Sequence, residues 1–313
     1  MRSFISGLCL LLLTMASASG QTCNFSISGI NFGSVDLITG AAVDATGTLN
    51  INCTGVPLTS VRICPNIGAG TGGATSTSRQ MVGASAMLNY QLYSNAARTT
   101  VWGSYNWAFT DRPPTIDLAI GLGGSASTTR TIFARLLAGQ TTAPATSYTS
   151  LFTAAHTQFS YGLVSTSGCP NILVAQTANP TFTVSALGVN NCSVTATNIN
   201  FGPQGVLSTN VDASGQVLAT CTIGTAYSIS LDGGGANAAP AARQMTSGGN
   251  IITYGLFQNV ARNLAWGSSV GIDTVAGTGT GSPQALTVFA RVPPQSTPPP
   301  GIYSDTIIVT VTY

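Results

Sequence analysis

The sequence contains two copies of one pattern, and this duplication constrains the fold more than any other feature. The segment ARTTVWGS at residues 97–104 is followed much later by ARNLAWGS at residues 261–268. The tripeptide RQM precedes both segments by the same distance, at Arg79–Met81 and Arg243–Met245. Because several matches keep the same order and nearly the same spacing, they indicate a duplicated domain rather than chance.

The first residues have the features of a secretory signal peptide. Arg2 precedes an apolar run that ends at Leu13, and small residues follow up to Gly20. A basic start, a short apolar segment and a small-residue cleavage zone are typical of such a leader, and the run is too short to span a membrane. We expect cleavage near Gly20 and export of the mature protein. The predicted parts are a signal peptide at 1–20, a first domain at 21–178, a joining segment at 179–191 and a second domain at 192–313.

The cysteines that remain after cleavage are expected to form disulfide bonds. Cys9 lies in the leader, and the mature chain keeps Cys23, Cys53, Cys64, Cys169, Cys192 and Cys221. An even count in an exported chain is typical of a disulfide framework. Each copy contains a pair with nearly the same spacing, which favours Cys23–Cys53 and Cys192–Cys221. This leaves Cys64 and Cys169 for each other.

The composition favours β-structure and argues against nucleic-acid binding. Charged residues make up only 6% of the chain, and its basic residues are all Arg and its acidic residues all Asp. Lys and Glu, which are strong helix formers, are absent, whereas Thr and Val are common in strands. A formal net charge of +2 leaves no basic surface for a nucleic acid.

The alternation of apolar and polar residues predicts half-buried strands. At the end of the chain Ile307, Val309 and Val311 share one face, and Thr310 and Thr312 share the other. Many short segments of this kind, separated by Gly, Ser, Asn and Pro, are typical of a β-sandwich. We predict an all-β protein of two tandem sandwich domains.

Several repeated motifs resemble the spore coat protein U domain family. They are the opening C…NFG…C, the RQM turn, the centre Y-x-L-[YF]…AR…WG, the strand [IV]-F-A-R and the ending GIYSDTIIVTVTY. The resemblance covers nearly the whole mature chain and is cleaner in the second copy. This family largely consists of subunits of archaic (Csu-type) chaperone–usher pili, and the two-domain layout resembles their tip adhesin.

The resemblance implies an immunoglobulin-like fold whose second copy lacks its final strand. Such a subunit is filled first by a periplasmic pilus chaperone and then, at the outer-membrane usher, by a strand from the adjacent pilin subunit. The given sequence stops at Tyr313 inside an alternating strand, and an open sheet edge invites another chain to pair with it. The alternative is a sheet that is complete as it stands.

Two short segments predict the place of the subunit in a fibre. Only Gln21 and Thr22 lie between the expected cleavage site and Cys23. Because so few residues cannot reach into another subunit, we expect a terminal subunit, displayed at the pilus tip on the cell surface. The segment at 179–191 places Phe182 and Val184 on one face of a strand, and we predict that it completes the first copy as an intramolecular donor strand. The alternative is a plain interdomain linker.

The longest insertion in the first copy predicts a binding loop. It lies within Ser104–Gly124 and brings apolar residues that the second copy lacks: Trp107, Phe109, Pro113, Pro114 and Ile116. Loops on rigid sandwiches often carry function, and an exposed apolar loop indicates a partner. We predict an apolar finger that attaches to an abiotic or host surface, joined by the loops Asn66–Ser78 and Ala138–Tyr148. The alternative is that Trp107 and Phe109 belong to the core of a longer hairpin.

The sequence argues against catalysis, a metal or a cofactor. GSSVG at 267–271 fits the G-x-S-x-G pattern, but that motif needs a following helix and a histidine base. The only histidine, His156, lies in the other copy. One histidine cannot build a metal site, and a chain without lysine has no phosphate-binding P-loop.

Two non-enzymatic alternatives to a surface adhesin remain. A structural coat or pilus shaft subunit would have one domain and an N-terminal donor segment. A carbohydrate-binding tip lectin would use an aromatic platform with acidic groups, such as Trp107 with Asp111 or Asp117. The aromatic residues that recur in both copies are expected to pack in the core: Tyr90, Trp102, Tyr254 and Trp266.

Overall fold

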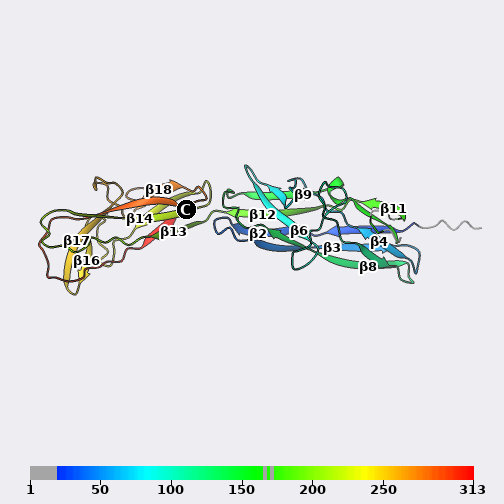
Figure 1. Ribbon diagram of the computed structural model, residues 1–313, viewed down its shortest axis with the longest axis horizontal. Coiled ribbons are helices and arrows are strands. Elements are labelled where there is room, and N and C mark those ends of the chain that lie inside the picture. The colour runs from blue at the N-terminus through cyan, green and yellow to red at the C-terminus, as the bar shows by residue number, and fades with distance from the viewer. Residues whose placement is uncertain (1–19, 165–167, 170–172) are drawn as a thin grey trace, which may run out of the picture.

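The computed structural model describes residues 20–164, 168–169 and 173–313, which fold almost entirely as β-strands. Figure 1 shows two β-rich bodies placed end to end, which we call the N-terminal body (residues 20–189) and the C-terminal body (residues 192–313). The predicted signal peptide falls almost wholly outside the described residues. In the described part of the chain the one helical element is a short 3-10 turn, η1 (Ala154–Thr157), and no helix is long and apolar enough to cross a membrane.

The N-terminal body is built from two sheets. Its strands are β1 (Thr22–Ile27), β2 (Ile30–Asp36), β3 (Val43–Thr54), β4 (Ser60–Cys64), β5 (Arg79–Val82), β6 (Met87–Tyr93), β7 (Ile116–Ala119), β8 (Ser125–Leu136), β9 (Ser147–Phe152), β10 (Phe159–Leu163), β11 (Leu173–Ala178) and β12 (Phe182–Val189). The larger sheet has the order β1-β3-β8-β6-β5-β9-β12-β2, and the smaller sheet has the order β11-β10-β4-β7. All neighbours in these sheets are antiparallel except β12 and β2.

Strict alternation places one face of each strand in a single core. In β9, for example, Tyr148, Ser150 and Phe152 are buried while the residues between them are exposed. This is the pattern expected for a strand with one solvated face. The core extends through both sheets and includes Leu49, Ile51 and Val61.

The C-terminal body repeats part of this arrangement with its own hydrophobic core. Its strands are β13 (Cys192–Ala196), β14 (Val211–Cys221), β15 (Ala226–Leu231), β16 (Arg243–Ser247), β17 (Asn250–Phe257), β18 (Val275–Thr278), β19 (Gln284–Val292) and β20 (Val309–Thr312). They form sheets of order β13-β14-β19-β17-β16 and β18-β15-β20.

Corresponding contacts confirm that the two bodies are copies of one fold. The Trp102 indole N–H donates to the carbonyl of Pro65 at 2.8 Å, and that of Trp266 donates to Ile229 at 2.9 Å. Both tryptophans are buried, as predicted, and so are Tyr90 and Tyr254. These buried indoles fix the same crossing of two sheets in both bodies.

Only Asn190 and Asn191 separate the last strand of one body from the first strand of the other. The Asn191 side chain donates to Asp36 in the N-terminal body at 2.9 Å, and its backbone N–H donates to the Thr222 hydroxyl in the C-terminal body at 3.1 Å. Pro144 and Ile223 form an isolated parallel bridge beside this junction. The two bodies are therefore joined by a short, hydrogen-bonded connection.

Candidate functional site

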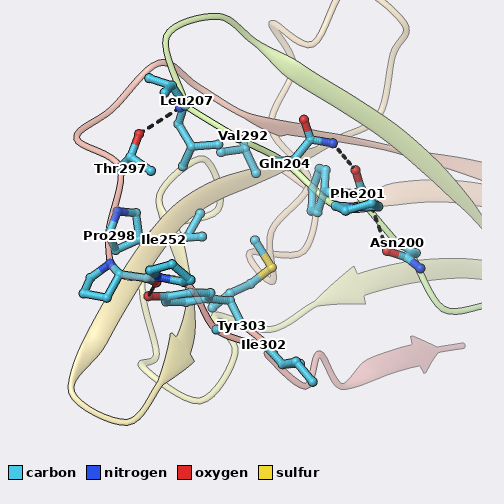
Figure 2. Close-up of a pocket in the computed structure, with 18 of the residues that line it drawn as sticks. Asn200, Phe201, Gln204, Leu207, Ile252, Val292, Thr297, Pro298, Ile302 and Tyr303 are labelled. Atoms are coloured by element: carbon cyan, nitrogen blue, oxygen red, sulfur yellow. Dashed lines mark hydrogen bonds between the residues drawn. The ribbon is translucent and has the colours of Figure 1, made fainter.

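A groove opens in the C-terminal body between two segments that form no strand pairing with each other and are joined at one end, where the Leu207 N–H donates to the Thr297 hydroxyl at 2.9 Å. One wall is formed by residues 199–207, after β13, and the other by residues 297–307, before β20. Figure 2 shows Phe201 and Leu207 on one side, Tyr303 and Pro298 on the other, and Ile252 near the floor. The groove has two adjoining parts, with volumes of about 750 Å³ and about 340 Å³.

In the N-terminal body the corresponding place is filled by β12. This strand lies between β9 and β2, antiparallel to the first and parallel to the second, with Val184 opposite both Ser150 and Ile30. The groove walls are the counterparts of these two neighbours. Residues 199–207 contain the second NFG motif, and β2 contains the first. Among the described residues of the C-terminal body, no strand takes the place of β12.

The register of the second wall follows from a shared contact. In the N-terminal body Thr149 of β9 pairs with Val82 of β5. In the C-terminal body Ser304 forms the equivalent bridge with Thr246. Residues 303–307 of the groove wall therefore correspond to residues 148–152 of β9.

The groove exposes part of several apolar side chains whose counterparts in the N-terminal body are buried. Residues around the β12 position are fully or almost fully buried in the N-terminal body, whereas their counterparts are only half-buried in the C-terminal body. The pairs are Ile30 and Ile199, Phe32 and Phe201, Met81 and Met245, and Leu88 and Ile252. Fully burying an exposed side chain of this size stabilises a protein by roughly 1.5–3 kcal/mol, and half-buried side chains gain only part of this when they are covered. The open groove is thus a surface that gains free energy when an apolar strand covers it.

The two residues predicted to donate a strand point into the core of the N-terminal body. Val184 is fully buried, and the Phe182 ring stacks on Phe152 with centroids 4.4 Å apart. At Gly188 a Cβ atom would lie only 2.8 Å from the Leu37 side chain, so glycine allows the strand to approach closely. Leu187, on the other face of β12, is 46% exposed.

The predicted apolar finger is instead folded back against the N-terminal body. The Trp107 ring lies over the guanidinium of the buried Arg79 at 4.7 Å, and its N–H donates to the carbonyl of Asp111 at 2.8 Å. Phe109 packs against Trp107 edge to face, with centroids 5.2 Å apart. Both aromatic side chains are half-buried. A cation beneath an aromatic face is a favourable position for the ring, which explains why the loop does not project.

Pro113 and Ile116 were expected at the surface, and this prediction is wrong. Both are buried, and Ile116 is the first residue of β7. Pro114 between them is half-buried. This part of the segment is therefore a strand beside the core and not an exposed tip, and β18 pairs with β15 in the C-terminal body as β7 pairs with β4.

The two other loops expected at the binding tip also lie elsewhere. Much of Asn66–Ser78 is buried, and its Thr71 pairs with Leu151 of β9. The Ala138–Tyr148 loop lies at the junction, where Pro144 bridges to Ile223 of the C-terminal body. Neither loop reaches the end of the molecule that points away from the C-terminal body.

That distal end carries exposed apolar residues on two other loops. β3 ends and β8 begins there, since Thr54 pairs with Ser125. Leu58 and Leu122 are 78% and 80% exposed, and Val56 is 48% exposed. The two loops are joined, because the Leu58 N–H donates to the Ile120 carbonyl at 3.1 Å. Single leucines between turn residues gave no periodic signal, so the sequence analysis missed them.

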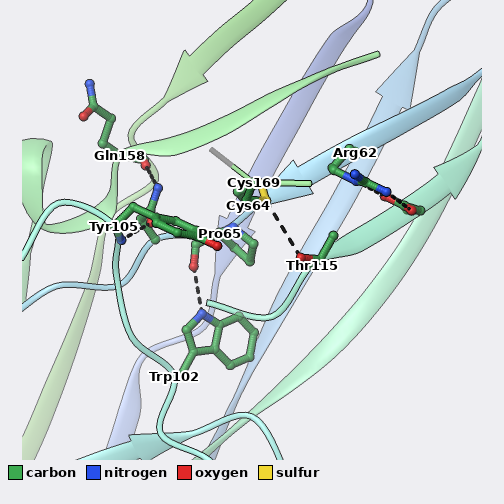
Figure 3. The surroundings of a disulfide bond; sticks show 10 residues. Arg62, Cys64, Pro65, Trp102, Tyr105, Thr115, Gln158 and Cys169 are labelled. Atoms are coloured by element: carbon green, nitrogen blue, oxygen red, sulfur yellow. Dashed lines mark hydrogen bonds and ion pairs between the residues drawn. A yellow bond between two sulfur atoms is a disulfide. The ribbon is translucent and has the colours of Figure 1, made fainter. Parts of the chain in front are cut away.

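The structure contains the three expected disulfide bonds, Cys23–Cys53, Cys64–Cys169 and Cys192–Cys221. The first and third each join the first strand of a body to its neighbour, with Cα atoms 4.1 Å apart in both. Figure 3 shows the second, which ties Cys64 at the end of β4 to Cys169, close to Thr115. Only the N-terminal body has this additional bond.

The residues considered for catalysis are not assembled into a site, and of the two aspartates considered for sugar binding, Asp111 lies beside Trp107 through its backbone carbonyl. Ser269 of the GSSVG segment lies in a turn that no helix follows, and its N–H donates to the Asp273 carboxylate at 2.7 Å. Asp117 is bonded to Arg62 at 2.8 Å. The described residues include no group of three or more His, Cys, Asp or Glu that would hold a metal ion.

Known proteins resemble this chain in sequence and in fold. Protein U of Myxococcus xanthus is 28% identical over 128 residues, which is 37% of this chain and 71% of Protein U. The CsuC–CsuE chaperone–tip adhesion subunit pre-assembly complex from archaic chaperone–usher Csu pili of Acinetobacter baumannii gives a TM-score of 0.54 at 18% identity. That match covers 93% of this chain and 100% of the matched chain. The CupB6 tip adhesin of Pseudomonas aeruginosa gives a TM-score of 0.39 at 11% identity, with 94% of each chain covered.

The family model of the Spore Coat Protein U domain matches twice, at residues 10–155 and 178–310. The first match falls on the N-terminal body, and the second begins just before β12 and continues through the C-terminal body. Together they cover most of the sequence. The chain therefore belongs to the Spore Coat Protein U domain family.

Proposed function

We propose that this chain is a non-enzymatic pilus tip adhesin, exported through the periplasm and displayed at the cell surface. In this proposal the N-terminal body, closed by residues 179–191, is the adhesive domain, and the C-terminal body is an incomplete immunoglobulin-like pilin domain. Its groove is covered first by a periplasmic chaperone and then, at an outer-membrane usher, by a strand of the adjacent pilin subunit. Family membership and the fold shared with a chaperone–tip adhesin complex support this assignment.

One observation carries the proposal: the groove lies where the N-terminal body holds β12. The same fold therefore occurs once with the strand in place and once without it. The occupant we infer is an extended strand from outside the described chain, antiparallel to residues 302–307, with apolar residues at alternate positions like those of β12. A bulky residue would correspond to Phe182, a β-branched one to Val184 and a glycine to Gly188.

Supplying that strand in cis tests the proposal. The sequence of residues 180–190 is fused after Tyr313 through a flexible Gly/Ser linker. We expect the thermal unfolding of the C-terminal body to move up by several degrees, because apolar floor residues become covered. The matched control carries Asp at the positions of Phe182 and Val184 in the fused copy. Equal melting of the two fusions would refute the strand-accepting role.

Attachment is assigned to the distal loops rather than to the Trp107 loop. Leu58 and Leu122 place two exposed apolar side chains at the end opposite the junction, where a tip subunit would meet a surface first. The proposed target is an apolar abiotic surface, because the two loops offer alkyl groups and no cluster of charges. Trp107 and Phe109 are assigned to the fold, as a cover over Arg79.

A pair of variants separates these two roles. Leu58→Ser with Leu122→Ser should abolish attachment of piliated cells to polystyrene while the purified protein melts as the wild type does. Trp107→Ser with Phe109→Ser should lower the melting temperature. Undiminished attachment of the leucine variant, with normal numbers of pili, would remove the distal loops from the proposal.

A further inference from the structure

Asp305 occupies an unusual position in the wall of the groove. Its carboxylate accepts three hydrogen bonds, from the Tyr254 hydroxyl at 2.7 Å, from the Gly235 N–H at 2.8 Å and from the Thr306 N–H at 2.8 Å. Burial and the bond to Asp305 both raise the pKa of Tyr254, which keeps its hydroxyl proton available for this carboxylate. A side chain at Gly234 would collide with the carboxylate, so the glycine loop is shaped around it.

The counterpart of Asp305 in the filled copy is a neutral residue. Ser150 stands at the same position of the fold, one residue after the bridge to β5, and it is fully buried. There the wall strand is held mainly by two hydrogen bonds between Leu151 and Thr71, and the Ser150 hydroxyl accepts a long one from the Gly72 N–H at 3.5 Å. Thr71 donates its N–H to the Leu151 carbonyl, and the Leu151 N–H donates to the Thr71 hydroxyl, both at 2.9 Å.

In the open copy the Asp305 carboxylate takes the place of the two hydrogen bonds between Leu151 and Thr71. Gly235 stands in the same position before Arg243 as Thr71 does before Arg79. Its N–H and that of Thr306 both donate to one oxygen of Asp305. Residues 305–308 belong to no strand. Beyond the Ser304 bridge, two carboxylates hold these residues, since the Ile308 N–H donates to the Asp232 carboxylate at 2.9 Å, and one backbone bond, from the Asp232 N–H to the Ile308 carbonyl at 3.1 Å, assists them.

We propose that Asp305 is a positioning residue that holds this wall extended while the groove is empty. The inference rests on the proposed strand-accepting function. A strand can pair only with an extended partner. The apparent affinity of the groove for a strand is therefore the intrinsic affinity multiplied by the fraction of molecules whose wall is extended. Because three donors already satisfy the carboxylate, covering it with a strand leaves it hydrogen-bonded.

The test measures binding of a labelled peptide to the full-length protein. The probe is a fluorescent peptide with the sequence of residues 180–190, PTFTVSALGVN. Asp305→Ala should weaken its binding about tenfold or more, mainly through slower association, since hydrogen bonds to a charged group are lost. Asp305→Asn keeps an oxygen that accepts both N–H groups and should retain most of the affinity. Thr306→Ala, which changes an exposed side chain of the same segment, is the matched control.

Hydrogen exchange gives a second measurement, which distinguishes a local change at the wall from a general loss of stability. In the free Asp305→Ala protein, the amides of Gly235 and Thr306 should exchange faster while those of β14 and β19 remain protected. If the peptide binds wild type and Asp305→Ala equally well, Asp305 does not position the wall, and the strand-accepting groove stands. If the peptide fails to bind the wild type, the groove proposal itself fails, and this inference fails with it.

Discussion

The two bodies of this protein share one fold and differ in whether a strand lies at the position of β12. In the N-terminal body, β12 lies between β9 and β2 and covers a fully buried core. In the C-terminal body, the corresponding segments enclose a groove whose apolar floor is half-buried. The comparison shows how one duplicated sequence forms both a body whose core is fully covered and a body with an open groove. The difference depends on a single strand.

The largest expected effect follows from removing that strand from the core. Phe182→Asp with Val184→Asp would place two charges in the N-terminal core and should destabilise it by more than about 5 kcal/mol, beyond the usual margin of a domain. Calorimetry should show the loss of one unfolding transition while that of the C-terminal body remains. Leu187→Asp, on the exposed face of β12, is the control and should melt nearly as the wild type does. An unchanged transition in the double variant would show that β12 does not complete this body.

Removing the disulfide bond that only the N-terminal body has should cause the next largest loss of stability. Cys64 and Cys169 are 105 residues apart, and a loop of this length corresponds to about 4.7 kcal/mol in the chain-entropy account. Cys192 and Cys221 are 29 residues apart and correspond to about 3.6 kcal/mol. Replacing both cysteines of one bond by serine should therefore lower the free energy of unfolding more at Cys64–Cys169 than at Cys192–Cys221, as measured by urea denaturation. The reverse ranking would mean that strain or residual structure outweighs loop length.

Both arginines are buried, but an aromatic ring is seen to lie over Arg79, so their contributions to stability should differ. Arg79 donates to the carbonyls of Ile67, Gly68 and Trp102, and Arg243 makes the equivalent set of bonds. Arg79→Met should cost about 3 kcal/mol, since acceptors remain buried without a donor. Arg243→Met should cost somewhat less, because the Arg79 variant also loses the contact between the cation and the Trp107 ring. Equal losses in chemical denaturation would indicate that the Trp107 ring adds little to the stability of the arginine site.

The smallest expected effect serves as an internal control. Asp44 and Asp212 occupy equivalent places, and hydrogen bonds from Arg135 and Arg291 lower the pKa of each carboxylate below its ordinary value of 3.8. A lowered folded-state pKa stabilises the protein above pH 3.8, and this stabilisation is lost as the pH falls through the folded value. Asp44→Asn and Asp212→Asn should each reduce the loss of stability at low pH in their own body. The two reductions should be equal and small, because both ion pairs are largely exposed. A clear difference between them in an acid titration would show that the bodies differ beyond the groove.

Much of the architecture was predictable because it depends on local, repeated patterns. The cysteine spacing gave the disulfide pairs, and the alternation around Phe182 and Val184 gave a strand that the structure places in the first core. Loop positions were not predictable in this way. Whether a loop reaches the tip depends on which end of a strand it follows, and Ala138–Tyr148 follows the end of β8 that faces the junction.

The role of Trp107 was missed for a different reason. The RQM motif was interpreted as a turn, although its arginine recurs in a chain with few basic residues. A cation that is kept in both copies of a nearly uncharged sequence is a signal of a buried, carbonyl-lined site. A buried arginine of this kind would have predicted that an aromatic residue of the insertion packs over Arg79.

The short junction has a mechanical consequence. Since only Asn190 and Asn191 lie between β12 and β13, tension applied to the C-terminal body passes directly into β12, along the axis of that strand. Two neighbouring strands then share the load in shear, so that many hydrogen bonds must rupture together. If β12 were pulled free, unravelling would meet the covalent link at Cys169 within a few tens of ångströms, since an extended residue spans about 3.3–3.6 Å. The N-terminal body should therefore resist tension that is applied to it through β12.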